Sequence, residues 1–185
     1  MPPRQARLPT VLLMTDERMG EALWPALERL PRGAGVVFRH YGLPMAERRA
    51  VYERVRRICR RRHLTLFLAG SPRQATGWKA AGVHGRSVRH SARPLLHSAP
   101  VHDRRELVAA RHADLRLVSP VFQTRSHVGA RALGPVRLGL MLGRDRKGIV
   151  ALGGMTHRRA QALRGLGITR WAAIDGLVPP EPIRT

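Results

Sequence analysis

Short apolar runs alternate with longer amphipathic stretches along almost the whole chain. Eight runs, bounded mostly by Gly, Pro or Ser, span residues 10–15, 35–40, 64–69, 81–85, 94–99, 115–121, 149–154 and 171–175. Continuous apolar runs of this length are typical of parallel strands that are buried on both faces. Helical patterns fill most intervals, at about residues 20–30, 44–62, 72–80, 103–112, 136–145 and 157–166. The last of these has Thr156 as its predicted N-cap and Gly165 as its predicted end.

Eight strands with helices between them imply either a (β/α)8 barrel or a doubly wound open sheet. The dinucleotide-binding pattern Gly-x-Gly-x-x-Gly is absent after the first run, which continues as Met14–Glu17, and neither a Walker A nor an HExxH motif occurs. The count of eight favours a single compact (β/α)8 barrel. Because few residues follow the fourth and eighth strands, we expect reduced helices there. We predict a lead-in at 1–9, the barrel at 10–177 and a Pro-rich tail at 178–185.

Length and cysteine content narrow the class of protein. A chain of 185 residues suits one domain, and its one cysteine, Cys59, excludes a disulfide framework, which indicates a reducing compartment. The longest apolar runs have about seven residues, far fewer than the roughly 20 that cross a bilayer. No signal-peptide pattern follows Met1. We therefore expect a cytoplasmic protein without a membrane partner.

The chain is strongly basic, with 34 Lys and Arg against 12 Asp and Glu and a net charge of +22. All of these cations except Lys79 and Lys147 are arginines, and the densest run is Arg54–Arg62. Such a charge raises the question of nucleic acid. However, only 4% of the residues are aromatic, and no zinc-finger, RNA-recognition or basic-zipper pattern occurs. We expect an arginine surface that attracts anions in general, and we do not expect sequence-specific nucleic-acid binding.

The carboxyl ends of the strands hold the active site in barrels of this class. Here those ends are rich in cations, hydroxyls and glycine. Thr124, Arg125 and Ser126 follow the sixth strand, and their donors could hold phosphate oxygens. Gly153 and Gly154 follow the seventh strand, where backbone without side chains would let N–H groups meet a phosphate. The sequence therefore predicts a phosphorylated ligand.

Four segments resemble thiamine phosphate synthase and its TenI-type thiazole tautomerase relatives: Gly82–Ser87, His97–Ala99, Leu117–His127 and Ala151–Met155. The resemblance covers about residues 10–177, in order and with compatible spacing. It implies a (β/α)8 barrel that joins hydroxymethylpyrimidine diphosphate to thiazole phosphate and releases diphosphate. Synthesis of thiamine phosphate is the leading hypothesis, with these two heterocycles as partners. A thiazole tautomerase, a non-catalytic thiazole-phosphate-binding homologue and a homodimer remain open.

The resemblance also implies roles for individual residues. Thr124 and Ser126 look like the hydroxyls that hold the thiazole phosphate. Gly154 and Ile174 look like the remainder of that pocket, together with Asp175, which stands where a serine is usual. A carboxylate repels a phosphate, so we expect Asp175 to point away or to contact the ligand only through its backbone.

The residues that the resemblance assigns to the diphosphate of the pyrimidine substrate depart in part from the family pattern. Arg39 and Ser98 match its arginine and serine, but His127 replaces a lysine and Pro100 replaces a histidine, with His97, His102 and His84 as the nearest alternatives.

The magnesium ion that the resemblance implies also lacks its usual ligands. Residues 54–102 contain no Asp or Glu, so only Asp16 or Asp103 could bind it elsewhere. We assign no metal ligand, and our hypothesis is that Arg39, Arg86 and His127 neutralise the diphosphate in its place.

Overall fold

The computed structural model describes residues 8–86, 94–124 and 131–178. Eight parallel strands close into a barrel in chain order, and the last strand pairs with the first. The strands are β1 (Val11–Met14), β2 (Gly35–Phe38), β3 (Thr65–Ala69), β4 (Gly82–His84), β5 (Leu96–Val101), β6 (Leu115–Val118), β7 (Ile149–Ala151) and β8 (Arg170–Ala173). The predicted (β/α)8 barrel is confirmed, and each predicted apolar run contains a strand or most of one.

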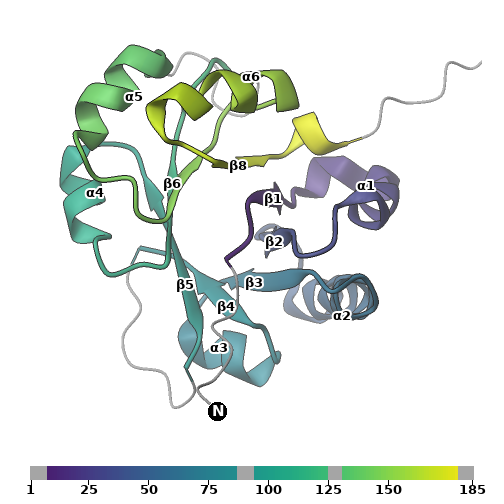
Figure 1. The fold of residues 1–185 in the computed structure, drawn as a ribbon. Helices are drawn as coiled ribbons and strands as arrows, with labels where there is room; N and C mark the ends of the chain where they lie inside the picture. The colour runs from purple at the N-terminus through teal and green to yellow at the C-terminus, as the bar shows by residue number, and fades with distance from the viewer. Residues whose placement is uncertain (1–7, 87–93, 125–130, 179–185) are drawn as a thin grey trace, which may run out of the picture.

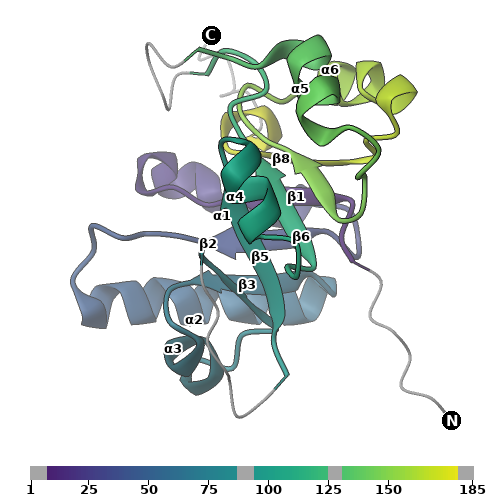
Figure 2. The same cartoon turned by 90° about the vertical axis from the view of Figure 1, so that its left-hand side faces the viewer.

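Helices surround the strands on the outside (Figure 1). They are α1 (Leu23–Arg29), α2 (Met45–Arg62), α3 (Pro72–Gly77), α4 (Arg104–Ala109), α5 (Gly134–Leu142) and α6 (His157–Ala162), with 3-10 turns η1 (Glu17–Ala22), η3 (Arg164–Leu166) and η4 (Asp175–Leu177). Both views place α2 and α5 on opposite sides of the barrel (Figures 1 and 2). After β8 the described residues hold only the short turn η4, while residues 87–93, after β4, lie outside the described part. No helix in the described ranges is both long enough and apolar enough to cross a bilayer.

The end of α6 differs from the prediction. Thr156 caps the helix as expected, because its side chain accepts a hydrogen bond from the N–H of Arg159. The helix nevertheless ends at Ala162, and Gly165 lies inside η3. The chain instead takes a left-handed turn at Gly167, with φ of 74°. Glycine adopts this conformation without the steric cost that a Cβ would add, so Gly167 ends the helical segment and Gly165 does not.

The interior of the barrel is a packed core. One cluster of buried residues fills it: Leu12, Met14, Val37, Phe67, Leu115, Leu117, Val150 and Ala172. Two further clusters lie outside the strands, where β1–β4 meet α1–α3 and where β5–β8 meet α4–α6. Because side chains alternate along a strand, Arg39 points inward two residues after Val37, as does His84 two residues after Gly82. The inner core thus ends in polar residues at the carboxyl ends of the strands.

The buried Arg48 on α2 fixes two of these strand ends. Its guanidinium donates hydrogen bonds to the carbonyl of Arg39, at 3.0 Å, and to that of Ala69, at 2.7 Å. It also lies 5.7 Å from the ring centre of Phe38 and 5.5 Å from that of Trp78. A charge-assisted donor in this position satisfies carbonyl groups that the ladder leaves open. Arg48 therefore holds the backbone at Arg39 in place.

Candidate functional site

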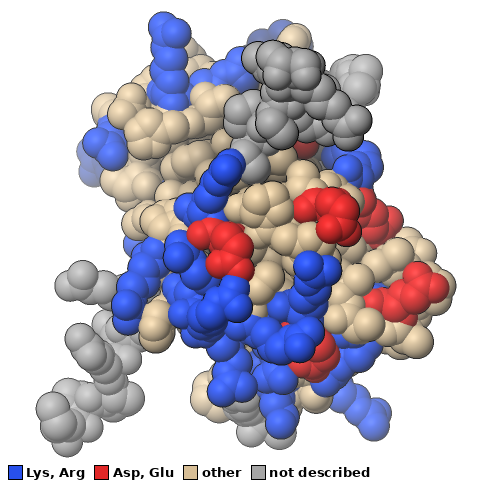
Figure 3. All heavy atoms as spheres, turned by 90° about the vertical axis from the view of Figure 1, so that its right-hand side faces the viewer, with Lys and Arg blue, Asp and Glu red and all other residues tan. Residues whose placement is uncertain are grey.

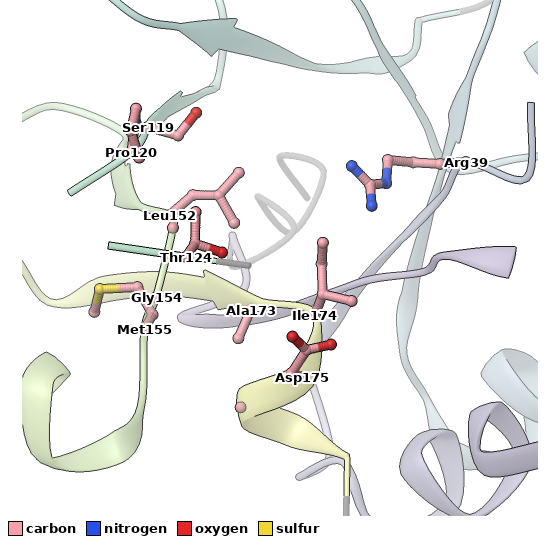
Figure 4. Close-up of a pocket in the computed structure, with 12 residues that line it drawn as sticks. Arg39, Ser119, Pro120, Thr124, Leu152, Gly154, Met155, Ala173, Ile174 and Asp175 are labelled. Atoms are coloured by element: carbon pink, nitrogen blue, oxygen red, sulfur yellow. The ribbon is translucent and has the colours of Figure 1, made fainter. Parts of the chain in front are cut away.

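A pocket opens at the carboxyl ends of β2, β6, β7 and β8 (Figure 4). Its walls are Arg39, Ser119, Pro120, Thr124, Leu152, Gly153, Gly154, Met155, Ala173, Ile174, Asp175 and Gly176. Thr124 and Gly154 stand on the same side, and Arg39 reaches in from the opposite side (Figure 4). The site therefore combines an apolar floor with hydroxyl, backbone and guanidinium donors.

The two glycines after β7 form the backbone part of this pocket. Gly153 has φ of 91° and Gly154 has φ of 59°, so both are in the left-handed region that favours glycine. No described residue accepts a hydrogen bond from either N–H group. Successive backbone N–H groups in a turn form concave anion-binding sites. This segment therefore offers two donors to a phosphate oxygen.

Close packing ties the glycine turn to the loop after β6. A Cβ on Gly154 would lie 2.2 Å from the carbonyl oxygen of Gln123, and a Cβ on Gly153 would lie 2.8 Å from the Cα of Pro120. Both neighbours are rigid parts of the loop that carries Thr124. The absence of side chains on the two glycines thus sets the position of the threonine hydroxyl relative to the turn.

Arg159 adds a cation that the sequence analysis missed. It lines a second hollow beside the first, together with Thr124, Gly154 and Asp175. Its guanidinium donates a hydrogen bond to the carbonyl of Gly154 and lies 4.9 Å from the ring centre of Phe122. In the sequence, only its position three residues after the predicted N-cap Thr156 indicates that Arg159 lies near the glycine turn. Arg159 places positive charge beside the glycine turn.

Arg39 is oriented by the end of β1. Its Nε donates to the carbonyl of Thr15 at 2.9 Å, and its Nη2 donates to Oδ2 of Asp16 at 2.8 Å. Asp16 also pairs with Arg18, and hydrogen bonds from Arg18 together with the charge of Arg39 lower the pKa of Asp16. No described residue accepts from Nη1 of Arg39, so this donor remains available to a ligand in the pocket.

His84 and Ser98 form a buried pair on neighbouring strands. Nδ1 of His84 lies 3.0 Å from the hydroxyl of Ser98, and their strands align the two residues directly. Ser98 is completely buried, and neither residue lines the pocket. Burial, aided by the charges of Arg39 and His97, lowers the pKa of His84 to about 4. The imidazole is therefore neutral at physiological pH.

This buried histidine predicts an acid-sensitive fold. The pKa of His84 is about 4 in the folded protein and about 6.5 in an unfolded chain, so protonation favours unfolding. The free energy of unfolding should fall by about 1.4 kcal/mol per pH unit as the pH drops from about 6.5 toward about 4. Urea titrations of wild type and His84→Gln across this range will measure the slope. The variant should show a flatter dependence, whereas the exposed control His112→Gln should retain the wild-type slope; equal slopes in all three proteins would contradict the assignment.

Arg86 lies away from the pocket. Its side chain is 70% exposed and pairs with Glu106, at 2.9 Å between Nη2 and Oε1. The same carboxylate is 2.8 Å from Nδ1 of His102. Arg86 is therefore directed toward α4, and the described structure does not place it with Arg39 as a second cation for the diphosphate.

The residues present do not fit the expected magnesium site. In the described ranges no three His, Cys, Asp or Glu side chains are close enough to hold a metal ion. Asp16 is paired with Arg18 and Arg39, while Asp103 caps α4 by accepting from the N–H of Glu106. The carboxyl ends of β3 and β4 lead to Gly70 and Arg86 and so offer no carboxylate. Since Mg²⁺ requires hard oxygen ligands, we assign no step to it.

The structure thus brings part of the predicted site together. Thr124, Gly153, Gly154, Ile174 and Asp175 line one pocket, and Arg39 faces them. The Asp175 carboxylate lies next to Ile174 on the β8 side of the pocket (Figure 4). Ser98 and Arg86 do not line this pocket. The predicted residues Arg125, Ser126 and His127 lie outside the described residues.

Comparisons with known proteins bear on the fold and on the family of the chain. Thiamine phosphate pyrophosphorylase from Pyrococcus furiosus has a similar structure, with a TM-score of 0.77 and 22% identity over 98% of this chain and 93% of that one. The Bacteroides thetaiotaomicron thiamine phosphate pyrophosphorylase matches with a TM-score of 0.61 and 15% identity over 90% of this chain and 83% of that one. At these identities the likeness shows the fold alone. No curated protein sequence matches the chain. The family model described as thiamine monophosphate synthase matches residues 11–177, and the chain belongs to that family.

Proposed function

We propose that this protein binds a phosphorylated thiazole and couples it to hydroxymethylpyrimidine diphosphate, which gives thiamine phosphate. One observation carries the proposal: Thr124 and the Gly153–Gly154 turn face the guanidinium of Arg39 across a single pocket. The glycine amides, the Thr124 hydroxyl and Arg159 would hold the thiazole phosphate. Arg39 would then meet the diphosphate of the second substrate.

The proposed reaction needs positioning and charge stabilisation more than proton transfer. The thiazole nitrogen forms a bond to the methylene carbon of the pyrimidine. The bond from that carbon to the diphosphate oxygen breaks, and its electron pair leaves with the diphosphate. Nη1 of Arg39 would neutralise this developing charge, and Asp16 and Thr15 hold the guanidinium ready for it. The apolar floor formed by Leu152 and Ile174 would exclude water from the carbon centre.

A second candidate is a thiazole-phosphate-binding protein without synthase activity. It is favoured by the absence of a metal-ligand cluster among the described residues and by the pairing of Arg86 with Glu106 outside the pocket. A tautomerase has weaker support, because it needs a base beside the thiazole. His84 is buried, Nε2 of His97 lies 2.8 Å from the carbonyl of Gly85 and His102 contacts Glu106, and none of them lines the pocket.

One pair of experiments separates the first two candidates. Thiazole phosphate and pyrimidine diphosphate are incubated with the protein, with and without Mg²⁺, and thiamine phosphate is measured. Calorimetry then measures the affinity for each substrate alone. Product formation supports the coupling reaction. Tight binding of thiazole phosphate, with no product in either condition and no affinity for diphosphate, supports the binding protein. The absence of affinity for both substrates would contradict both candidates.

A further inference from the structure

Most of the arginine side chains of helix α2 lie outside the face that packs against the barrel. Its 18 residues include eight arginines and two glutamates. Arg48 and Arg62 are directed inward, where Arg48 contacts the strand ends and Arg62 donates to the carbonyl of Leu30. With a helical period of 3.6 residues, Arg54, Arg57, Arg60 and Arg61 fall on the exposed side away from the barrel. The other two, Arg49 and Arg56, lie half-buried on the flank of the helix. We call these six arginines the α2 face: Arg49, Arg54, Arg56, Arg57, Arg60 and Arg61.

Few carboxylates neutralise the α2 face. Glu53 is shared between Arg49 and Arg56, and Glu28 on α1 pairs with Arg61. The side chains of Arg57 and Arg60 are exposed and form no ion pair or hydrogen bond with any described residue. Figure 3 shows Lys and Arg side chains gathered on the side of the molecule where Figure 1 places α1 and α2.

Helix stability explains only part of this cluster. Arg60, Arg61 and Arg62 form the last turn, where cations favour the negative end of the helix dipole. Arg54 and Arg57 precede that turn and gain little from the dipole, which acts within the final turn. Arg54, Arg57 and Arg60 therefore form a stripe of positive charge along the helix, and no described carboxylate pairs with it.

We propose that the α2 face binds the phosphodiester backbone of nucleic acid without selecting its bases. Guanidinium groups match phosphate oxygens as two-pronged donors, and lysine, which lacks this geometry, is absent from the helix. Arg57 and Arg61 are four residues apart, which brings their side chains onto adjacent turns about 5–6 Å apart. Within the α2 face no described aromatic ring is open to stack on bases, because Arg54 lies 3.6 Å from the ring centre of Trp24 and Tyr52 is buried. The exposed ring of Tyr41 precedes the helix, at the opposite end from Arg60. Phosphate contacts of this kind confer affinity and no sequence preference.

A lipid surface fits the same helix less well. An interfacial helix inserts an apolar face into the membrane. The apolar residues in the middle of α2, such as Tyr52, Val55 and Ile58, are buried against the barrel. The exposed apolar residues Tyr41 and Met45 lie beside the opposite end of the helix from Arg60. The α2 face therefore offers charge without the apolar anchor that a membrane needs.

The test uses the full chain and a labelled single-stranded RNA of about 20 nucleotides, with binding followed by fluorescence anisotropy. Between about 50 and about 200 mM NaCl, log K should fall linearly with log salt. The double variant Arg57→Gln, Arg60→Gln removes two charges that have no partner in the described structure. It should bind more weakly, and its salt slope should be smaller by about 1.4, since each phosphate contact on a single strand contributes about 0.7.

The control variant Arg137→Gln, Arg144→Gln removes two exposed arginines on the α5 side and should retain most of the wild-type affinity and slope. Duplex DNA of equal length should bind with a similar salt dependence if the phosphate backbone is the ligand. Equal losses in the two double variants would overturn the proposal, as would tighter binding to polyglutamate or to anionic vesicles than to RNA. The affinity for thiazole phosphate should be the same in the α2 variant as in the wild type. A negative result for RNA binding would therefore leave the proposed coupling reaction untouched.

Discussion

Replacing Gly154 by alanine is expected to weaken the binding of thiazole phosphate by about tenfold or more, equivalent to about 1.4 kcal/mol. The new Cβ would lie 2.2 Å from the carbonyl oxygen of Gln123, and this backbone atom cannot rotate away as a side chain would. The left-handed φ of 59° adds strain of about 1–2 kcal/mol for a residue with a Cβ. Either the glycine turn or the loop with Thr124 must move. The glycine amides and the Thr124 hydroxyl would then no longer reach the same phosphate. Calorimetry with thiazole phosphate measures the loss.

The matched control is Gly165→Ala. A Cβ at Gly165 meets no atom within 4 Å, so this variant should bind thiazole phosphate as the wild type does. Circular dichroism and the thermal midpoint will show whether Gly154→Ala keeps its fold. If it does not, Thr124→Val removes one hydroxyl at nearly constant shape and should weaken binding by about 1 kcal/mol. Wild-type affinity in both Gly154→Ala and Thr124→Val would exclude this pocket as the phosphate site.

The fold could be predicted because each strand of a closed parallel barrel is buried on both faces and appears as its own apolar run. The predicted positions of the strand ends were less accurate. The run at 115–121 predicted one long strand, but β6 ends at Val118. Of the remaining residues, Ser119 and Val121 are buried and Pro120 is partly buried. The N–H of Ser119 donates to the carbonyl of Val101 and that of Val121 to the carbonyl of Leu152, but the ladder does not continue. Burial alone does not distinguish a strand from the loop that follows it.

The same contrast applies to the site. The positions of Thr124 and Gly154 follow from local turn chemistry and from the strand that precedes each, so the sequence could place them. The partner of Arg86 is Glu106, twenty residues away in the chain, and only the tertiary structure brings the two together. Arg159 was missed because one arginine in a chain with 34 basic residues gives no distinct signal. The sequence leaves Asp16 available to bind a metal, but in the structure its carboxylate pairs with Arg39 and Arg18.

Replacing Arg39 by glutamine is expected to raise the Kd for inorganic diphosphate by about 10- to 100-fold, because a hydrogen bond to a charged group contributes about 1.5–3 kcal/mol. Formation of thiamine phosphate should fall by about two to three orders of magnitude if this donor stabilises the departing diphosphate. The affinity for thiazole phosphate should change little, because that group is assigned to the opposite wall of the pocket. Arg39→Lys keeps the charge without the forked geometry and should be intermediate in both measurements.

Arg18 provides a stringent control, because it shares the partner of Arg39 without sharing its position. Both guanidinium groups bind Asp16, but Arg18 is 57% exposed and does not line the pocket. Arg18→Gln therefore removes the same type of ion pair while the donor toward the ligand stays in place. It should leave diphosphate affinity and product formation near the wild-type values. If the Arg18 and Arg39 variants lose diphosphate binding equally, general positive charge attracts the anion; if neither loses it, Arg39 has no role in recognition. In both cases the diphosphate does not bind beside the guanidinium of Arg39. The proposed coupling reaction would then have no structural basis.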